Sequence, residues 1–268
     1  MNILRAVVNF VDYPLRQLIH WHRGILTPVN EDKSRLFKSL PPDLAEEAVT
    51  SAKHFLDTYH LQSLYENSTK ESYLYNLYYL ELLERVFEQV SFDLPESISA
   101  VDIGASSWFY VQALYGFLKY WQSLSGRMVT LTGYEIDPYR IYSNLHSRYD
   151  HALTNIQGLH GVEYIPHKFV ALPEHFNLTF MFFPFVFIKD HLEWGLPSNR
   201  FDPGELWKIA IESTKPSGLL ILVNQSIEEN RAQLDLLKMF GKKPELTFRN
   251  ESLFYSYPIP HYVSVVRK

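Results

Sequence analysis

Apolar and polar positions along this chain of 268 residues follow one pattern up to about residue 95 and another after it. In the first part apolar residues recur at helical spacing, which predicts helices over 43–65 and 70–90. From residue 99, short apolar runs typical of buried strands alternate with longer segments of helical periodicity. This pattern predicts strands within 99–104, 128–137, 162–172, 177–188, 218–225, 245–257 and 261–268, and helices over 107–124, 138–156, 202–216 and 228–241.

Alternating strands and helices are typical of a parallel sheet that carries helices on both faces. We therefore expect an α/β fold over residues 96–268, with a doubly wound sheet and a final antiparallel pair at 245–257 and 261–268. Residues 1–95 run into this region without a flexible linker. They are expected to form a helical cap on the sheet domain.

Composition limits the classes of function that are open to the chain. Hydrophobic residues make up 46% and aromatic residues 15%, which supports a large core and an apolar pocket. The chain has no cysteine, so disulfides, thiolate zinc sites and a cysteine nucleophile are excluded. The formal net charge of −5 argues against general electrostatic binding of nucleic acid. We therefore expect a small-molecule substrate and no nucleic-acid partner.

The first 24 residues are apolar, but Arg5, Asp12 and Arg16 interrupt them. They lack the compact apolar region and the cleavage site of a signal peptide, and no run in the chain is long enough to span a bilayer. The sequence therefore predicts a cytoplasmic protein without a membrane span. Its first helix is expected to dock on the protein's own core, with a membrane-surface helix as the alternative. His20 and His22 would diverge on that helix, so no metal site is predicted.

The stretch Val101–Ser106, with the sequence VDIGAS, marks the end of a buried strand that turns into a helix. Nucleotide-type cofactors dock at such turns, because glycine lets the main chain approach and the helix N-terminus favours negative charge. Only one glycine is present here. At the end of the next strand stands Glu135, followed by Asp137 and Pro138.

This order of elements and these motifs resemble the class I S-adenosylmethionine-dependent methyltransferases over residues 95–268. The family has an acid-x-Gly-x-Gly-x-Gly turn after its first strand. Asp102 and Gly104 match it, while Ser106 and Trp108 stand at the second and third glycine positions. The resemblance implies a seven-stranded, mostly parallel sheet whose last strand inserts antiparallel. It also implies S-adenosylmethionine as the cofactor.

The resemblance assigns cofactor-binding residues to three strand ends. The acid at the end of the second strand would bind the ribose, and the turn after the first strand would receive the methionine end. The indole of Trp108 either fills this site or packs between helix and sheet. The contacts to the adenine, where the third strand ends in His167 and Lys168, stay unassigned. The candidate cofactor-binding residues are Asp102, Gly104, Ala105, Ser106, Glu135, Ile136, Asp137 and Phe183.

Two departures from related patterns bear on function. Glu135 lies 33 residues beyond Asp102, whereas the dinucleotide-binding fold expects about 20. The fourth strand carries Asn177 where the family has an acid, and it ends in Phe-Phe-Pro-Phe at 182–185. This end resembles the Asn/Asp-Pro-Pro-aromatic motif of amino-group methyltransferases without its leading polar residue, so methylation of adenine or cytosine is not supported.

The acceptor of the methyl group is expected beyond the fourth strand. Phe183, Pro184 and Phe185 would line an apolar slot for a small or medium-sized acceptor. If a proton must be removed, His191 is the candidate base, because the unperturbed pKa of histidine lies near neutrality. Asp190 or Glu193 could assist it or face solvent.

Two other functions compete with methyl transfer. A relative that has lost its cofactor would keep the fold as a binding or scaffolding module, which Trp108 and Asn177 favour and Glu135 opposes. A nicotinamide oxidoreductase is disfavoured, because the chain lacks Gly-x-Gly-x-x-Gly.

Overall fold

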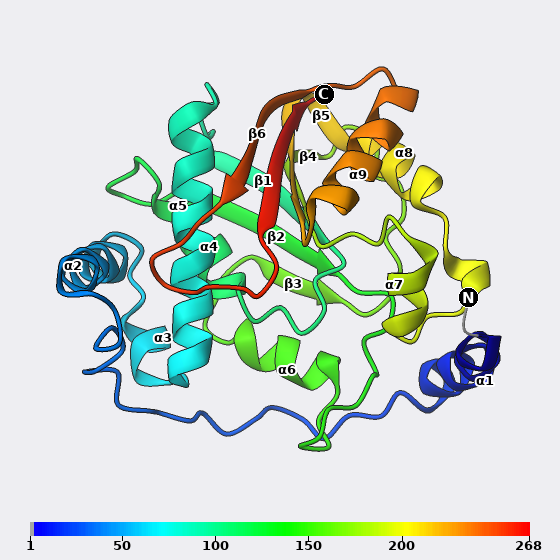
Figure 1. Ribbon diagram of the computed structural model, residues 1–268, viewed down its shortest axis with the longest axis horizontal. Coiled ribbons are helices and arrows are strands. Elements are labelled where there is room, and N and C mark those ends of the chain that lie inside the picture. Colours follow the sequence, from blue (N-terminus) through cyan, green and yellow to red (C-terminus); the bar gives the residue numbers. More distant parts are fainter. Residues whose placement is uncertain (1–2) are drawn as a thin grey trace.

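A twisted sheet of seven strands runs through the computed structural model, which describes residues 3–268 (Figure 1). The strands lie in the order β3-β2-β1-β4-β5-β7-β6, and only β7 runs antiparallel to both of its neighbours. This order confirms the predicted doubly wound, seven-stranded fold with an inserted antiparallel last strand. The strands are β1 (Ser97–Ile103), β2 (Met128–Tyr134), β3 (Val162–Ile165), β4 (Phe176–Phe182), β5 (Thr214–Asn224), β6 (Pro244–Asn250) and β7 (His261–Arg267).

Helices cover both faces of the sheet, because neighbouring strand residues point to opposite sides. Ala100 belongs to a core cluster that includes side chains of α4 and α5, while Val101 belongs to a second cluster with Trp207 and Leu237. The first face carries α4 (Lys70–Gln89), α5 (Val111–Tyr120) and α6 (Arg148–Asn155), and the second carries α8 (Pro203–Ser213) and α9 (Ile227–Met239).

The N-terminal helices lie at two different ends of the sheet. The helices α2 (Pro42–Thr58) and α3 (Gln62–Glu66) lie beside α4, whereas α1 (Ile3–Ile19) lies near α7 (Ile188–Glu193) on the far side of the molecule (Figure 1). The segment 20–32 joins them and runs past α6 without helix or strand. We call this segment the strap. No helix among the described residues has the length and apolar character needed to cross a bilayer.

Two predicted helices begin later than expected. The helix predicted over 107–124 is α5, which begins at Val111, and the larger difference concerns α6. The sequence predicted a helix over 138–156, but α6 begins at Arg148. The hydroxyl of Ser147 accepts the N–H of Asp150, and the carboxylate of Asp150 accepts the N–H of Ser147, which forms a capping box. This cap fixes the first turn of the helix at Ser147, so residues 138–146 form a loop above the sheet.

Asn76 ties the N-terminal helices to the sheet domain. Its side chain is fully buried on α4, donates to the carbonyl of Phe109 at 2.9 Å and accepts the N–H of Ala113 at 2.9 Å. The N-cap residue of α5, Tyr110, has no side-chain cap of its own. Asn76 therefore caps α5 from a neighbouring helix and satisfies one of its free N–H groups.

We expect Asn76→Ala to lower the free energy of unfolding by about 3 kcal/mol, because it leaves a buried N–H and a buried carbonyl without partners. Asn67→Ala is the matched control, since the amide of Asn67 is exposed and donates to Ser63 within its own turn. That change should cost less than about 0.5 kcal/mol. Urea denaturation measures both, and equal effects would contradict the role of Asn76.

Candidate functional site

The turn after β1 has left-handed backbone at alternate residues. Gly104, Ser106 and Trp108 have φ of 87°, 54° and 51°. These are the three positions at which the motif named above has glycine. A left-handed backbone costs a residue with a side chain roughly 1–2 kcal/mol, so the turn keeps the glycine conformation at two positions without glycine. Gly104 is exposed, and no atom lies within 4 Å of the place its Cβ would take.

Glu135 joins this turn to the loop after β2. One carboxylate oxygen accepts the N–H of Ser106 at 2.8 Å, and the other accepts the N–H of Asp137 at 2.7 Å. The side chain of Glu135 is buried, and burial raises the pKa of its carboxyl group. The guanidinium of Arg148, 3.6 Å away, acts in the opposite direction and lowers this pKa. Glu135 thus lies next to the turn at the carboxyl edge of the sheet, where open α/β sheets bind ligands.

Asp102 and Trp108 lie beneath the turn. The carboxylate of Asp102 accepts the indole N–H of Trp108 at 2.7 Å and the hydroxyl of Tyr110 at 2.8 Å. All three side chains are buried. The indole fills the space above Gly133 on β2, where a Cβ would stand 2.8 Å from its ring. Trp108 therefore packs between helix and sheet, which resolves the alternative left open by the sequence. Burial raises the pKa of Asp102 to about 7.

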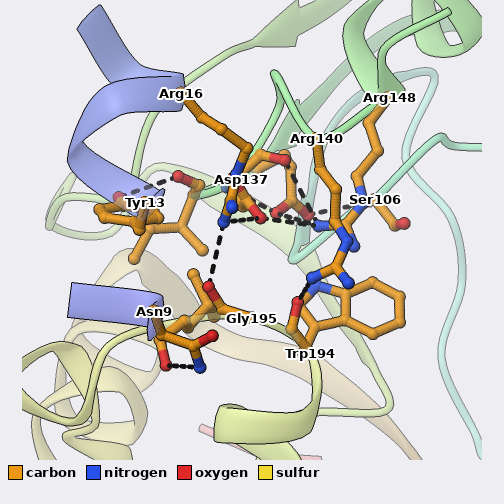
Figure 2. A network of polar contacts seen from close by, with 12 residues as sticks. Asn9, Tyr13, Arg16, Ser106, Asp137, Arg140, Arg148, Trp194 and Gly195 are labelled. Carbon is orange, nitrogen blue, oxygen red and sulfur yellow. Dashed lines mark hydrogen bonds and ion pairs between the residues drawn. The ribbon is translucent and has the colours of Figure 1, made fainter. Parts of the chain in front are cut away.

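A network of arginines and acids surrounds Asp137 (Figure 2). Arg148 is buried, forms ion pairs with Glu135 and Asp137 at 3.6 Å each, and stacks on the ring of Trp194 with 4.0 Å to the centroid. From α1, Arg16 donates to both carboxylate oxygens of Asp137, at 3.1 and 3.0 Å. These contacts hold α1 against the carboxyl edge of the sheet.

A pocket of about 630 Å³ lies between α1 and the ends of β2 and β3. From α1 the lining includes Phe10, Pro14 and Leu18. The amide nitrogen of Gln17 is buried in this region and has no hydrogen-bond partner among the described residues. The lining includes Tyr13, Gln17, Ile136, His167, Lys168 and Arg200.

The structure brings most of the candidate cofactor residues together. Gly104 and Ala105 both donate their N–H groups to the carbonyl of Tyr134, so the turn is fixed on the end of β2. Ile136 lines the pocket, and its carbonyl accepts the hydroxyl of Tyr13 at 3.1 Å. Phe183 follows β4 with a left-handed φ of 59°. Asp102 lies below this group, beneath Trp108.

The candidate catalytic residues lie on α7, next to α1. His191 is buried, its Nε2 lies 3.0 Å from the carbonyl of Pro197, and its ring meets Phe185 and Phe201 edge-on. Burial lowers the pKa of His191 and so favours the neutral imidazole. Asp190 is half-buried on the same helix. Within residues 3–268, no group of three or more histidine or acidic side chains is arranged to hold a metal ion.

Sequence reasoning missed a buried pair near Phe183. The hydroxyl of Tyr78 lies 2.7 Å from Nδ1 of His261, and burial lowers the pKa of His261 to about 4. The ring of Phe183 packs on His261 at 4.7 Å. The sequence contained a signal for His261, which is the first residue of the last strand. An antiparallel last strand begins at the edge where the parallel strands have their carboxyl ends. Arg16 and Arg148 gave no such signal, since their acid partners belong to other elements.

Comparisons with known proteins give matches in structure only. No family model and no curated protein matches the sequence. A methyltransferase from Aquifex aeolicus described as SAM-dependent is 14% identical with a TM-score of 0.49, over 81% of this chain and 97% of its own. A class I protein from Listeria monocytogenes, described as a putative S-adenosylmethionine-dependent methyltransferase, is 12% identical with a TM-score of 0.49, over 87% and 77%. A SAM-dependent methyltransferase from Leishmania major is 11% identical with a TM-score of 0.49, over 90% and 97%. The fold assignment rests on the strand order described above.

The stability of the protein should depend on the protonation of Asp102. Its pKa is about 7 in the folded protein and about 3.9 in an unfolded chain. Between these values the folded state keeps a proton that the unfolded state has released, so stability falls as the pH rises from about 4 to about 7. Asp102→Asn should remove this loss. The free energy of unfolding of the variant, relative to the natural protein, should therefore rise by a few kcal/mol over that range.

Urea denaturation at a series of pH values measures this difference, and parallel profiles would contradict it. Tyr110→Phe supplies the control, because the Tyr110 hydroxyl lowers the pKa of Asp102. This change should raise the pKa of Asp102, so that the loss of stability extends to higher pH in the natural background, and it should leave the profile of the Asp102→Asn protein unaltered.

Proposed function

We propose that this chain binds S-adenosylmethionine at the carboxyl ends of β1 and β2 and transfers its methyl group to a small or medium-sized apolar acceptor. The observation that carries the proposal is the left-handed backbone of Gly104, Ser106 and Trp108. Strained backbone persists only where its surroundings enforce it, and it clusters at functional sites. A turn that keeps the glycine conformation without two of its glycines favours a retained cofactor turn.

The groups around the turn suit the polar half of this cofactor. The open space above Gly104 allows a ligand to lie against the main chain. Each oxygen of Glu135 receives one N–H group, and a carboxylate has about four acceptor positions, so the remaining positions would accept the ribose hydroxyls. The buried Asp102 would act indirectly by holding Trp108 and Tyr110 under the turn.

The pocket beneath α1 suits the adenine. Ile136 directly follows the ribose-binding candidate and offers an apolar wall to a flat ring. The buried amide nitrogen of Gln17 has no partner, and a rotation of this side chain into the pocket would let it donate to a ring nitrogen of the base. Buried polar groups are normally hydrogen-bonded, so an amide left unpaired in a pocket wall supports a ligand with an acceptor at that point.

The bound cofactor would supply a methyl group that is activated on its sulfonium. The residues of this chain would orient the acceptor and exclude water from the site. The apolar side chains after β4 suit both tasks. Where the acceptor must lose a proton, His191 is the proposed base, with Asp190 beside it. Hydrogen bonding of Nε2 to the carbonyl of Pro197 leaves Nδ1 to accept the proton, and burial keeps the ring neutral.

Gly104→Val should abolish binding of S-adenosylhomocysteine, because the new side chain fills the space above the turn. Gly158→Val is a matched control, since Gly158 is also exposed, has φ of 77° and faces open space. Both changes should cost roughly 1–2 kcal/mol through backbone strain. Ligand at a hundred times its dissociation constant should stabilise the natural protein and Gly158→Val by about 2.7 kcal/mol, but not Gly104→Val.

Denaturation with and without S-adenosylhomocysteine makes this measurement. Equal stabilisation of all three proteins would mean that the ligand binds elsewhere. No stabilisation of any of them would reject the cofactor and favour a binding or scaffolding module.

Gln17→Leu should change stability and binding in opposite directions. Removal of an unpaired buried amide should leave the free energy of unfolding unchanged or raise it by about 1 kcal/mol. Loss of the donor to the adenine should weaken binding of S-adenosylhomocysteine about ten-fold. Isothermal titration calorimetry gives the affinity, and unchanged affinity in the folded variant would remove Gln17 from the site.

A further inference from the structure

A second pocket lies between α2 and residues 33–38, at the other end of the molecule from α1 (Figure 1). Its volume is about 380 Å³, which is within the range of small-molecule sites. Leu36 and Phe37 form an apolar wall on one side, and Ala52 and Leu56 of α2 form another. We call it the α2 pocket. No residue of the candidate cofactor site lines it.

Every charged side chain among the described residues that line the α2 pocket is basic. These side chains are Lys33, Arg35, Lys38 and Lys53, although the whole chain has 30 acidic and 25 basic residues. None of the four forms an ion pair within residues 3–268. Three of them are exposed, and only Lys33 is buried.

Lys33 directly follows the strap and carries a buried charge that the protein leaves unpaired. Only 5% of the residue is exposed. Its ammonium group donates to the carbonyls of Glu31 and Ser68, at 3.1 and 2.6 Å, and lies 5.3 Å from the centre of the Tyr65 ring. Burial lowers the pKa of Lys33, and the carboxylates of Glu31 and Asp32 only partly oppose this. Buried charges are normally paired, and an ammonium group has three donors, so one N–H is left for an anion.

The acids near Lys33 are engaged elsewhere. Oε2 of Glu31 accepts the N–H of the first residue of α4 at 2.8 Å. The carboxylate of Asp32 accepts the N–H and the hydroxyl of Ser34, at 2.9 and 2.8 Å. Both acids are exposed, and so is Asp57 of α2, which does not line the pocket. The side chains of this protein therefore do not supply the anion that the lining of the α2 pocket requires.

The hydroxyl of Tyr73 is a second donor without a counterpart in the α2 pocket. Only 2% of Tyr73 is exposed, and its hydroxyl forms no hydrogen bond with any residue from 3 to 268. The oxygen is not one of the atoms that are closed off from solvent, so it opens into the pocket that Tyr73 lines. The ring of Tyr73 packs on Tyr65 with 5.2 Å between centroids. The free hydroxyl and the ammonium of Lys33 thus belong to side chains that flank the same ring.

We propose that the α2 pocket binds the anion of a medium-chain fatty acid. Its carboxylate has two oxygens, one for the ammonium of Lys33 and one for the hydroxyl of Tyr73. The alkyl chain would lie along the apolar walls, and the three exposed basic residues would attract the anion to the opening. Phosphate would leave the apolar walls unused, and a polypeptide would bring polar main-chain groups against them. This proposal does not depend on the proposed methyl transfer.

Isothermal titration calorimetry of the full chain with decanoate tests the proposal. Decanoate, kept below its micelle concentration, should bind in a one-to-one complex. The decyltrimethylammonium ion has the same tail and the opposite charge, and it should bind at least about ten-fold more weakly. Octanoate should also bind about ten-fold more weakly than decanoate, because two buried CH2 groups are lost.

Tyr73→Phe removes the free hydroxyl and keeps the ring. It should weaken binding of decanoate about ten-fold, because hydrogen bonds to charged groups are strong. The unfolding temperature should not change, since no hydrogen bond within the protein is lost. Tyr79→Phe is the matched control, because Tyr79 lies on the same helix, its hydroxyl also lacks a partner, and its ring stacks on Phe182 outside the pocket. This control should bind decanoate as the natural protein does.

Lys33→Gln tests the charge. The new amide can still donate to the carbonyls, but the positive charge is gone. The preference for decanoate over decyltrimethylammonium should therefore fall about ten-fold.

Four outcomes would overturn the proposal. The first is no binding of decanoate to the natural protein. The second is equal affinity for the anion and the cation, which would mean that the pocket selects only an apolar tail. The third is an equal effect of Tyr73→Phe and Tyr79→Phe, and the fourth is an unchanged preference in folded Lys33→Gln. Either of the last two would place the carboxylate elsewhere.

Discussion

A carboxylate that is buried at a sheet edge must be supplied with partners, because an unpaired charge away from water is very costly. Glu135 meets this constraint by accepting N–H groups from the loops after β1 and β2 and by lying near Arg148. Arg148 in turn requires Asp137 and the ring of Trp194, and Asp137 requires Arg16. Five parts of the chain, namely the loops after β1 and β2, the helices α1 and α6 and the end of α7, are thereby held at one point. The shape of the candidate site follows from these contacts.

The helix α1 connects this network to the outside of the molecule. Its inner side holds Asp137 through Arg16 and forms one wall of the pocket beneath it, and its outer side carries exposed apolar side chains such as Val8, Val11 and Leu15. Any partner that shifts α1 therefore acts on both the pocket and the charged network. Such coupling needs no long pathway through the protein, since the same helix contributes to both surfaces.

The sequence predicted the features that depend on local pattern. Apolar runs located the seven strands, and the acid after an apolar run located Glu135 at a strand end. The predicted start of α6 was wrong, because the capping box of Ser147 and Asp150 competes with the helical pattern of 138–146. The orientation of Trp108 was not predictable, since it depends on Gly133 of another strand. The pair of Arg16 with Asp137 joins residues 121 apart, which no local pattern indicates.

The contact between Trp108 and Gly133 has an evolutionary consequence. The indole occupies the volume that a side chain at 133 would need, with only 2.8 Å to a Cβ there. A larger residue at 133 would clash with the indole, and glycine at 108 would leave a cavity beside β2, which is costly in a close-packed core. Each single change would therefore destabilise the fold, whereas the two changes together, a larger residue at 133 and glycine at 108, would be tolerated. Lineages with tryptophan and with glycine at this turn should be separated by paired substitutions.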